Sequence, residues 1–427
     1  MTHPDRTTPP KISSFGRLTI PEPRHSTLDN GIPTTIVDQG TDDVCLLSIV
    51  WQGGLAEAPS PKVATLTALT MREGTANRSG AEIAETLEYN GAQLAIMPST
   101  HFTRIDLTVL NSRLEYVLPV IADIFCNPTY PERELHVLRE NQARNLEIER
   151  EKVDFQAVTM MNRLIMGENN PLAVESLPEH IRATSRDSVI SFWESVFKAA
   201  PVHIYLAGKI SPQVENLVNH HIGSIKFDHS PLKLNIVPFS PSERQSAVIT
   251  RDESLQSAVR LAIPTIGRDN PDYTALRLLI MALGGYFGSR LMLNLREDKG
   301  YTYGIQAHLL GFREGGIMMI NTECDNSYVA PLIEEVKNEI RRLASGDFTE
   351  TEVERLRFNA MSQLASMLDT PFSIADYYRN HLLSNTPSDY FDCQQDAIAA
   401  LSPSRLASLA RHLDISRLYT VIAGNPQ

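Results

Sequence analysis

The chain has 427 residues, of which 42% are hydrophobic and 21% are charged, a composition typical of globular proteins that dissolve in water. One hydrophobic core rarely organises so long a chain, so we expect two domains. The 39 basic and 51 acidic residues give a net charge of −12, which argues against a nucleic-acid partner. The sequence contains no apolar run long enough to span a bilayer, so we expect no membrane partner.

The first 27 residues are polar and rich in proline, and they predict an extended N-terminal arm. This segment lacks the apolar stretch of a secretory signal peptide. The four cysteines are far apart in sequence and form no C-x-x-C pair, which favours free, buried thiols in a reducing compartment. We therefore expect a cytoplasmic protein.

Hydrophobic periodicity predicts a first domain in residues 28–228. A turn at Asn30-Gly31 lies between two short strand segments. The other strands are expected at 45–51, 101–110 and 202–208, and the helices at 62–73, 79–90, 114–125 and 132–152, with Ser79 as a helix cap.

The segment 229–242 carries three prolines and little periodicity, and we expect it to be a linker. A second domain is then expected in residues 243–427. Its predicted strands are 258–263 and 316–322, and its predicted helices are 273–283, 329–343 and 349–368. The last helix begins with Thr349 and Glu352 in the spacing of a capping box.

Two segments of the second half resemble segments of the first. The helical segment 135–146 matches 353–364 at an offset of 218 residues, and the strand 202–208 matches 418–424 at an offset of 216 residues. Similar offsets at two separate places indicate a duplication. The sequence therefore predicts an α+β protein of two homologous domains, each a largely antiparallel sheet covered by helices.

The segment 284–311 places an arginine near a tyrosine. A helix pattern ends at Gly284-Gly285, a second short helical pattern follows at 291–295, and a strand pattern begins at Tyr301. Arg296 therefore lies at a helix end, seven residues before Tyr303 at the start of a strand. A fixed positive charge and a phenolic donor can bind a carbonyl or a developing oxyanion. By spacing alone, an ordinary helix C-terminus with a nearby cation explains the pattern better.

The residues GGYFGSRL and LREDKGYTY in this segment resemble the second-domain signature of the M16 metallopeptidases. That family includes pitrilysin, insulysin, the mitochondrial processing peptidase and half-length bacterial members. The resemblance extends from about Leu28 to Pro426. It implies a fold of the LuxS/MPP-like metallohydrolase type, in which the domains face each other around a chamber. It also implies that Arg296 and Tyr303 contact the substrate.

Active M16 enzymes carry H-x-x-E-H on a helix of the first domain, where two histidines on one face bind zinc and the glutamate acts on the zinc-bound water. In this chain the matching segment is ATLTALTMREGT, residues 64–75, and the three motif positions hold Thr65, Ala68 and Leu69. These side chains can neither bind zinc nor act as a general base. Glu147 stands near the position of the family's distal glutamate ligand, but a lone carboxylate on a charged helix is usually solvated, and we assign it no metal role.

M16 peptidases can be split between two half-length subunits, one with H-x-x-E-H and the other with the arginine and tyrosine. The resemblance implies that this chain is the second kind of subunit, inactive alone, and that a partner subunit supplies the zinc for cleavage of unstructured peptides. One alternative is a homodimeric, non-enzymatic protein that binds peptides or serves as a scaffold. Another is an independent peptidase with an unrecognised metal site, for which the sequence offers no ligand cluster.

Overall fold

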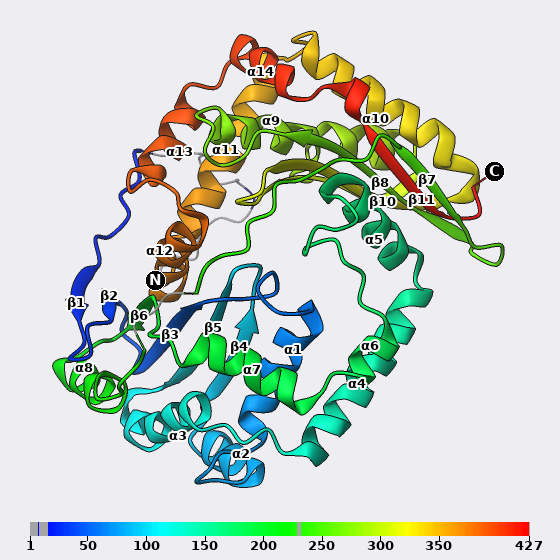
Figure 1. Cartoon of the computed structure of the whole chain (residues 1–427). Coiled ribbons are helices and arrows are strands. Elements are labelled where there is room, and N and C mark those ends of the chain that lie inside the picture. The colour runs from blue at the N-terminus through cyan, green and yellow to red at the C-terminus, as the bar shows by residue number, and fades with distance from the viewer. Residues whose placement is uncertain (1–6, 8–15, 229–231, 427) are drawn as a thin grey trace.

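The computed structural model describes residue 7, residues 16–228 and residues 232–426. Parts of the predicted arm and of the predicted linker therefore lie outside the described residues. The chain forms two halves, each a β-sheet with helices on its outer face (Figure 1). The predicted α+β class and the two similar domains are confirmed.

The first sheet has six strands in the order β1-β2-β6-β3-β5-β4. Its pairs are antiparallel, except that β2 and β6 are parallel. The prediction missed β4, a short edge strand without a clear alternation of polar and apolar residues. The strands are β1 (Arg24–Thr27), β2 (Pro33–Asp38), β3 (Val44–Gln52), β4 (Gln93–Pro98), β5 (Phe102–Leu110) and β6 (His203–Gly208).

The helices of the first half follow the predicted series and add several that were missed. Ser79 caps α2 as predicted, because its hydroxyl accepts from the backbone N–H of Glu82 while the Glu82 carboxylate accepts from the backbone N–H of Ser79. The helices are α1 (Pro61–Thr70), η1 (Met71–Glu73), α2 (Gly80–Tyr89), η2 (Asn111–Arg113), α3 (Leu114–Cys126), α4 (Glu132–Glu151), α5 (Val153–Met166), α6 (Pro178–Arg182), α7 (Arg186–Phe197), α8 (Pro212–Val218) and η3 (Asn219–Gly223).

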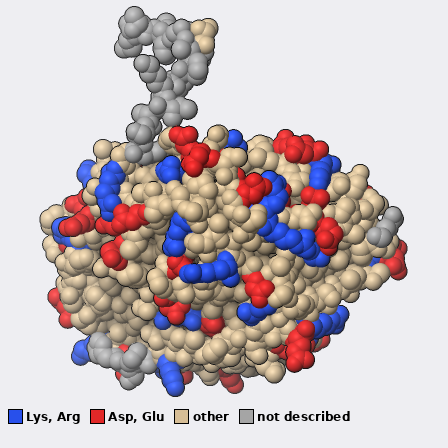
Figure 2. Space-filling model, turned by 90° about the horizontal axis from the view of Figure 1, so that it is seen from above, with Lys and Arg blue, Asp and Glu red and all other residues tan. Residues whose placement is uncertain are grey.

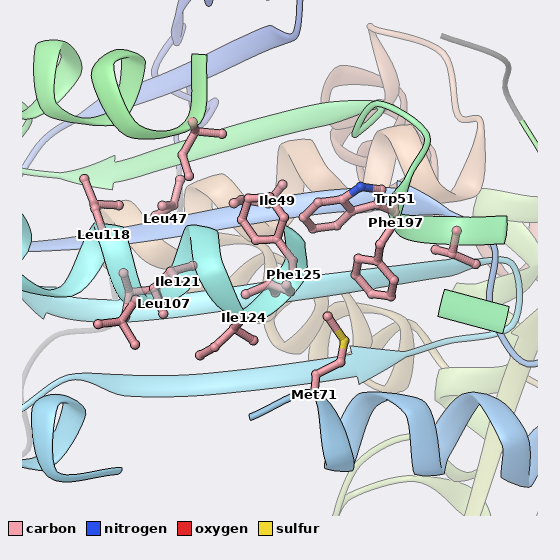
Figure 3. Close-up of a cluster of buried hydrophobic side chains, with 14 of the residues drawn as sticks. Leu47, Ile49, Trp51, Met71, Leu107, Leu118, Ile121, Ile124, Phe125 and Phe197 are labelled. Carbon is pink, nitrogen blue, oxygen red and sulfur yellow. The ribbon is translucent and has the colours of Figure 1, made fainter. Parts of the chain in front are cut away.

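An aromatic cluster lies at the centre of the first core (Figure 3). The ring of Trp51 on β3 lies 5.2 Å from the ring of Phe125 on α3 and 4.9 Å from that of Phe197 on α7. Tilted ring pairs at such distances stabilise a core beyond the area they bury. This cluster fixes the outer helices against the sheet.

The second sheet repeats the first. Its order β7-β11-β8-β10-β9 corresponds to β2-β6-β3-β5-β4, and its one parallel pair, β7 with β11, takes the place of β2 with β6. The shared strand order supports the duplication that the repeated sequence segments indicated. The strands are β7 (Ser246–Thr250), β8 (Gln256–Thr265), β9 (Thr302–Gly311), β10 (Gly316–Asp325) and β11 (Tyr419–Gly424).

The predicted capping box of the second half forms only in part. Thr349 accepts from the backbone N–H of Glu352, but the Glu352 carboxylate accepts from Arg290, at 2.6 Å from Nε and 2.9 Å from Nη2. A bidentate bond to the buried Arg290 is stronger than a bond to a backbone donor. The helices are α9 (Tyr273–Gly284), η4 (Met292–Asp298), η5 (Asn326–Tyr328), α10 (Val329–Ala344), α11 (Glu350–Ser366), α12 (Pro371–Ser384), α13 (Tyr390–Ala399), α14 (Pro403–Leu409), η6 (Ala410–His412) and η7 (Ile415–Arg417).

Each half contributes one helix to the sheet of the other half. Helix α5 of the first half packs against β8 and β11, and helix α12 of the second half packs against β2 and β6 (Figure 1). The pairs α4 with α11 and α5 with α12 both begin 218 residues apart, so the exchange is reciprocal. The predicted domains are continuous segments of the chain, whereas α5 and α12 each pack against the sheet of the other domain.

Buried arginines fix these exchanged helices. Arg379 of α12 is 3% exposed, and its Nη1 donates to Ser48 Oγ at 3.0 Å and lies 3.4 Å from Asp106 Oδ1. In the second half, Arg260 of β8 forms an ion pair with Asp154 of α5. Arg379 also pairs with Asp376 of its own helix, and Asp106 also pairs with Arg104. These contacts of buried arginines tie each helix to the opposite sheet.

A buried charged triad joins the loops of the two halves. His101, between β4 and β5, lies 2.7 Å from Glu57 Oε1 through Nδ1 and 2.6 Å from Glu314 Oε1 through Nε2. None of the three side chains is more than 4% exposed. Burial alone would lower the pKa of His101, but the hydrogen bonds to Glu314 and Glu57 and their negative charges raise it to about 9. A charged imidazolium therefore connects the halves at neutral pH.

The cysteines agree only in part with the expectation of buried thiols. Cys45 and Cys324 are buried and Cys126 is half-buried, but Cys393 is exposed on α13.

Acidic and basic side chains are interspersed on the face seen from above (Figure 2). None of the helices in the described residues has the length and hydrophobicity needed to cross a bilayer.

Candidate functional site

Tight turns place the arginine and the tyrosine side by side. Helix α9 ends where Gly284 leaves no room for a side chain, because a Cβ there would lie 2.7 Å from Ala307 on β9. After η4, Gly300 reverses the chain with φ +63, in the left-handed region that favours glycine. The segment after α9 is thereby folded against the start of β9.

Arg296 and Tyr303, the two residues expected to contact the substrate, are in contact with each other. The Arg296 Cζ lies 5.1 Å from the ring centroid of Tyr303, within the range of a cation–π interaction. The Tyr303 residue is 90% exposed, and the Arg296 side chain is 30% exposed. The Nε of Arg296 lies 3.5 Å from Glu297 Oε1, and the described residues offer its two Nη atoms no ion-pair partner. The guanidinium can therefore donate to an incoming ligand.

The backbone beside Tyr303 is fixed although its side chain is exposed. Thr302 Oγ1 donates to the carbonyl of Glu323 at 2.7 Å and lies 2.9 Å from that of Gly304. These bonds stand where the register between β9 and β10 shifts. A bulge of this kind commonly redirects a side chain beside a functional site. It presents the phenol of Tyr303 to solvent.

Tyr303 lies on an edge strand, and a cavity lies further along the same strand. Within the described part of the chain β9 pairs with β10 alone, so its other side is open. A cavity of about 350 Å³ lies between α9, β9, α11 and α13. An extended peptide can pair with such an edge by main-chain hydrogen bonds while a pocket holds one of its side chains.

The zinc-motif positions lie in the other half, on α1. The hydroxyl of Thr65 donates to the carbonyl of Pro61 at 3.0 Å, Ala68 is buried, and Leu69 is half-buried. A hydroxyl already bonded to its own helix and two hydrocarbon side chains do not fit a zinc ion. Among the residues that the structure describes, no group of three histidine, cysteine, aspartate or glutamate side chains could hold a metal ion.

Glu147 on α4 lies in a surface ion pair. Its Oε1 lies 2.8 Å from Nη1 of Arg182, and its side chain is 48% exposed. The hydrogen bond from Arg182 lowers the pKa of Glu147. The carboxylate is therefore charged and compensated by an arginine.

Phe287 also contacts Arg296, which the sequence did not predict. The Arg296 Cζ lies 4.9 Å from the ring centroid of Phe287, which is 61% exposed in the turn after α9. Phe287 is part of the motif GGYFGSRL, but nothing in the hydrophobic pattern indicated that its ring would leave the core. The only feature of the sequence that could have indicated an exposed ring is the position of Phe287 in a turn between Gly285 and Gly288.

Family models match both halves of the chain. The model described as Insulinase (Peptidase family M16) matches residues 38–173, and the model described as Peptidase M16 inactive domain matches residues 183–360. YmxG of Bacillus subtilis, an uncharacterised zinc protease, is 23% identical over 394 residues, covering 91% of this chain and 94% of that protein. The human mitochondrial-processing peptidase subunit beta is 23% identical over 404 residues, covering 90% of this chain and 81% of that protein.

Solved structures share the fold. The crystal structure of a peptidase M16 inactive domain from Pseudomonas fluorescens has a TM-score of 0.85 at 21% sequence identity. The similarity covers 95% of this chain and 98% of that one. The two-half architecture is therefore the same along almost the whole chain.

Proposed function

This chain belongs to the M16 peptidase family, and we propose that it is the non-zinc subunit of a heterodimeric M16-type peptidase. The observation that carries the proposal is the contrast between the two halves. The first half holds Thr65, Ala68 and Leu69 where a catalytic subunit needs zinc ligands and a general base. The second half presents Arg296 and Tyr303 in contact, with the phenol exposed.

In the proposed complex the partner subunit carries H-x-x-E-H and the zinc, and this chain binds the peptide. The substrate is an unstructured peptide that extends along the open edge of β9. The free Nη atoms of Arg296 and the hydroxyl of Tyr303 donate hydrogen bonds to the carbonyl at the bond to be cleaved. Donors that are in place before the reaction stabilise the charge that develops on this oxygen.

The assembled complex tests this role. It would be purified from the source cells through a tag on this chain, and its partner, its zinc content and its cleavage of unstructured peptides would be measured. We expect a one-to-one partner with H-x-x-E-H and about one zinc ion per pair. Recovery of this chain alone as a metal-free homodimer would favour a non-enzymatic peptide-binding or scaffold protein. Zinc bound by this chain alone would contradict our interpretation of α1.

Variants test the two residues. Arg296→Ala and Tyr303→Phe should each lower turnover by about a hundredfold, the usual effect of losing one such donor. Neither variant should change the amount of partner recovered, because both side chains reach solvent. Tyr89→Phe, which alters an 82% exposed tyrosine on α2, is the matched control and should keep full activity. Full activity of Arg296→Ala and Tyr303→Phe would contradict the proposal.

A further inference from the structure

Phe287 is an exposed aromatic residue with a specific neighbour. It lies in the turn between α9 and η4, is 61% exposed, and is absent from the hydrophobic clusters of the described residues. A single exposed aromatic side chain needs no explanation in itself. Phe287 differs because its ring faces the guanidinium of Arg296, with 4.9 Å between the Arg296 Cζ and the ring centroid.

Two rings from different segments therefore contact one guanidinium. Phe287 precedes Arg296 by nine residues, and Tyr303 follows it by seven, with the Arg296 Cζ 5.1 Å from the Tyr303 ring centroid. In the described chain, the only carboxylate that forms an ion pair with Arg296 is that of Glu297, whose Oε1 lies 3.5 Å from Nε. The planar guanidinium stacks well on aromatic faces. Ring contacts, rather than a strong ion pair, thus restrict the orientation of Arg296.

We propose that Phe287 is a positioning residue that holds Arg296 toward the carbonyl of the bound peptide. The inference rests on the proposed function of Arg296. Phe287 has no polar side-chain atom, so it cannot itself donate a hydrogen bond to the peptide carbonyl, and it affects that donor through its contact with Arg296. Tyr303 contributes the second ring, but it also carries the hydroxyl that donates to the peptide. A free arginine side chain has many rotamers, and the Phe287 ring reduces them before the peptide arrives.

The turn that carries Phe287 is itself constrained. A Cβ at Gly285 would lie 2.7 Å from the Met281 Cα, so the chain must leave α9 along a narrow path. A Cβ at Gly288 would lie 3.1 Å from the Tyr286 ring and 3.3 Å from the Arg355 side chain. The backbone on both sides of Phe287 is thus crowded, and this limits the paths that the turn can take.

The first test measures the arginine directly. In the ¹⁵N-labelled full chain, the Nε–Hε signal of Arg296 is identified by its loss in Arg296→Lys. Ring currents should shift this signal, and Phe287→Leu should move it toward the position of exposed arginines and increase its mobility. Phe287→Tyr should preserve the shift, and Tyr89→Leu is the control. An Arg296 signal unchanged by Phe287→Leu would overturn the inference, whatever the function of the chain.

The second test measures turnover by the purified complex on a library of quenched-fluorescent unstructured decapeptides. Phe287→Leu should lower kcat about two- to fivefold with little change in KM, and Phe287→Tyr should restore it. If Arg296→Ala lowers turnover but Phe287→Leu leaves it unchanged, the positioning role is wrong and the proposed function stands. If Arg296→Ala itself has no effect while the NMR contact persists, the proposed function fails and this role fails with it.

Discussion

The charged triad between the halves should make the stability of the protein depend on the protonation of one histidine. We expect His101→Gln to destabilise the protein at neutral pH and to have much less effect at alkaline pH. Glutamine retains a side chain that can form hydrogen bonds but lacks the positive charge. In the variant, Glu57 and Glu314 therefore face each other without a cation between them.

The magnitude follows from the pKa of His101, which the two carboxylates raise from 6.5 to about 9. A raised pKa adds stability that is fully present below the pKa of the unfolded chain and is lost as the pH rises through the folded value. At about 1.4 kcal/mol per unit, the charge contributes about 2–3 kcal/mol at pH 7 and almost nothing at pH 10.

The acid limit comes from Glu57. Burial alone would raise its pKa, but the hydrogen bonds from His101 and from the backbone N–H groups of Asn235 and Gly54 lower it. A lowered pKa adds stability that is lost as the pH falls through the folded value. The triad should therefore stabilise the protein most between the acid titration of Glu57 and the alkaline titration of His101.

Urea unfolding of wild type and variant at pH 7 and at pH 10 measures the effect. We expect a loss of about 2–3 kcal/mol at pH 7 and less than about 1 kcal/mol at pH 10. His136→Gln, which alters an exposed histidine on α4, is the matched control and should change neither value. An equal loss at both pH values would refute the reasoning, because the imidazole would then act through packing rather than through its charge.

Two further predictions concern the exchanged helices. Arg379→Met should cost about 1–3 kcal/mol in urea unfolding, because Asp376 loses its ion pair and Asp106 keeps only Arg104. Arg17→Met, at an exposed ion pair, should change little, and equal effects would contradict the role given to burial. Residues 16–242 and 243–426, expressed separately, should each fail to unfold cooperatively, and co-expression should restore one folded complex, because α5 and α12 cover the opposite sheets. A half that folds alone would show that the exchange is dispensable.

The resemblance to the M16 motif predicted Arg296 and Tyr303 as site residues, whereas the spacing alone did not, and neither predicted the geometry of the site. Tyr303 follows Arg296 by seven positions, and the glycines at 284 and 300 correctly indicated where the chain turns. The second ring, from Phe287, could not be foreseen. Hydrophobicity predicts that a phenylalanine is buried, whereas this ring stays exposed against a guanidinium.

The local sequence likewise did not predict the hydrogen-bond partner of Glu352. The sequence paired Glu352 with the cap of its own helix, but the buried Arg290 binds the carboxylate instead. The spacing of a capping box depends on one helix only. The competing arginine lies 62 residues away in the chain, and only folding brings it close.

The sequence by itself determined the α+β class, the duplication and the absence of zinc ligands at Thr65, Ala68 and Leu69. These features depend on residue identity and on periodicity along the chain. Only the tertiary structure decided that α5 and α12 exchange sheets and that His101 joins the halves. An amphipathic helix specifies that one face must be buried but not which sheet will cover it. That choice depends on contacts between residues far apart in the chain, which no local pattern records.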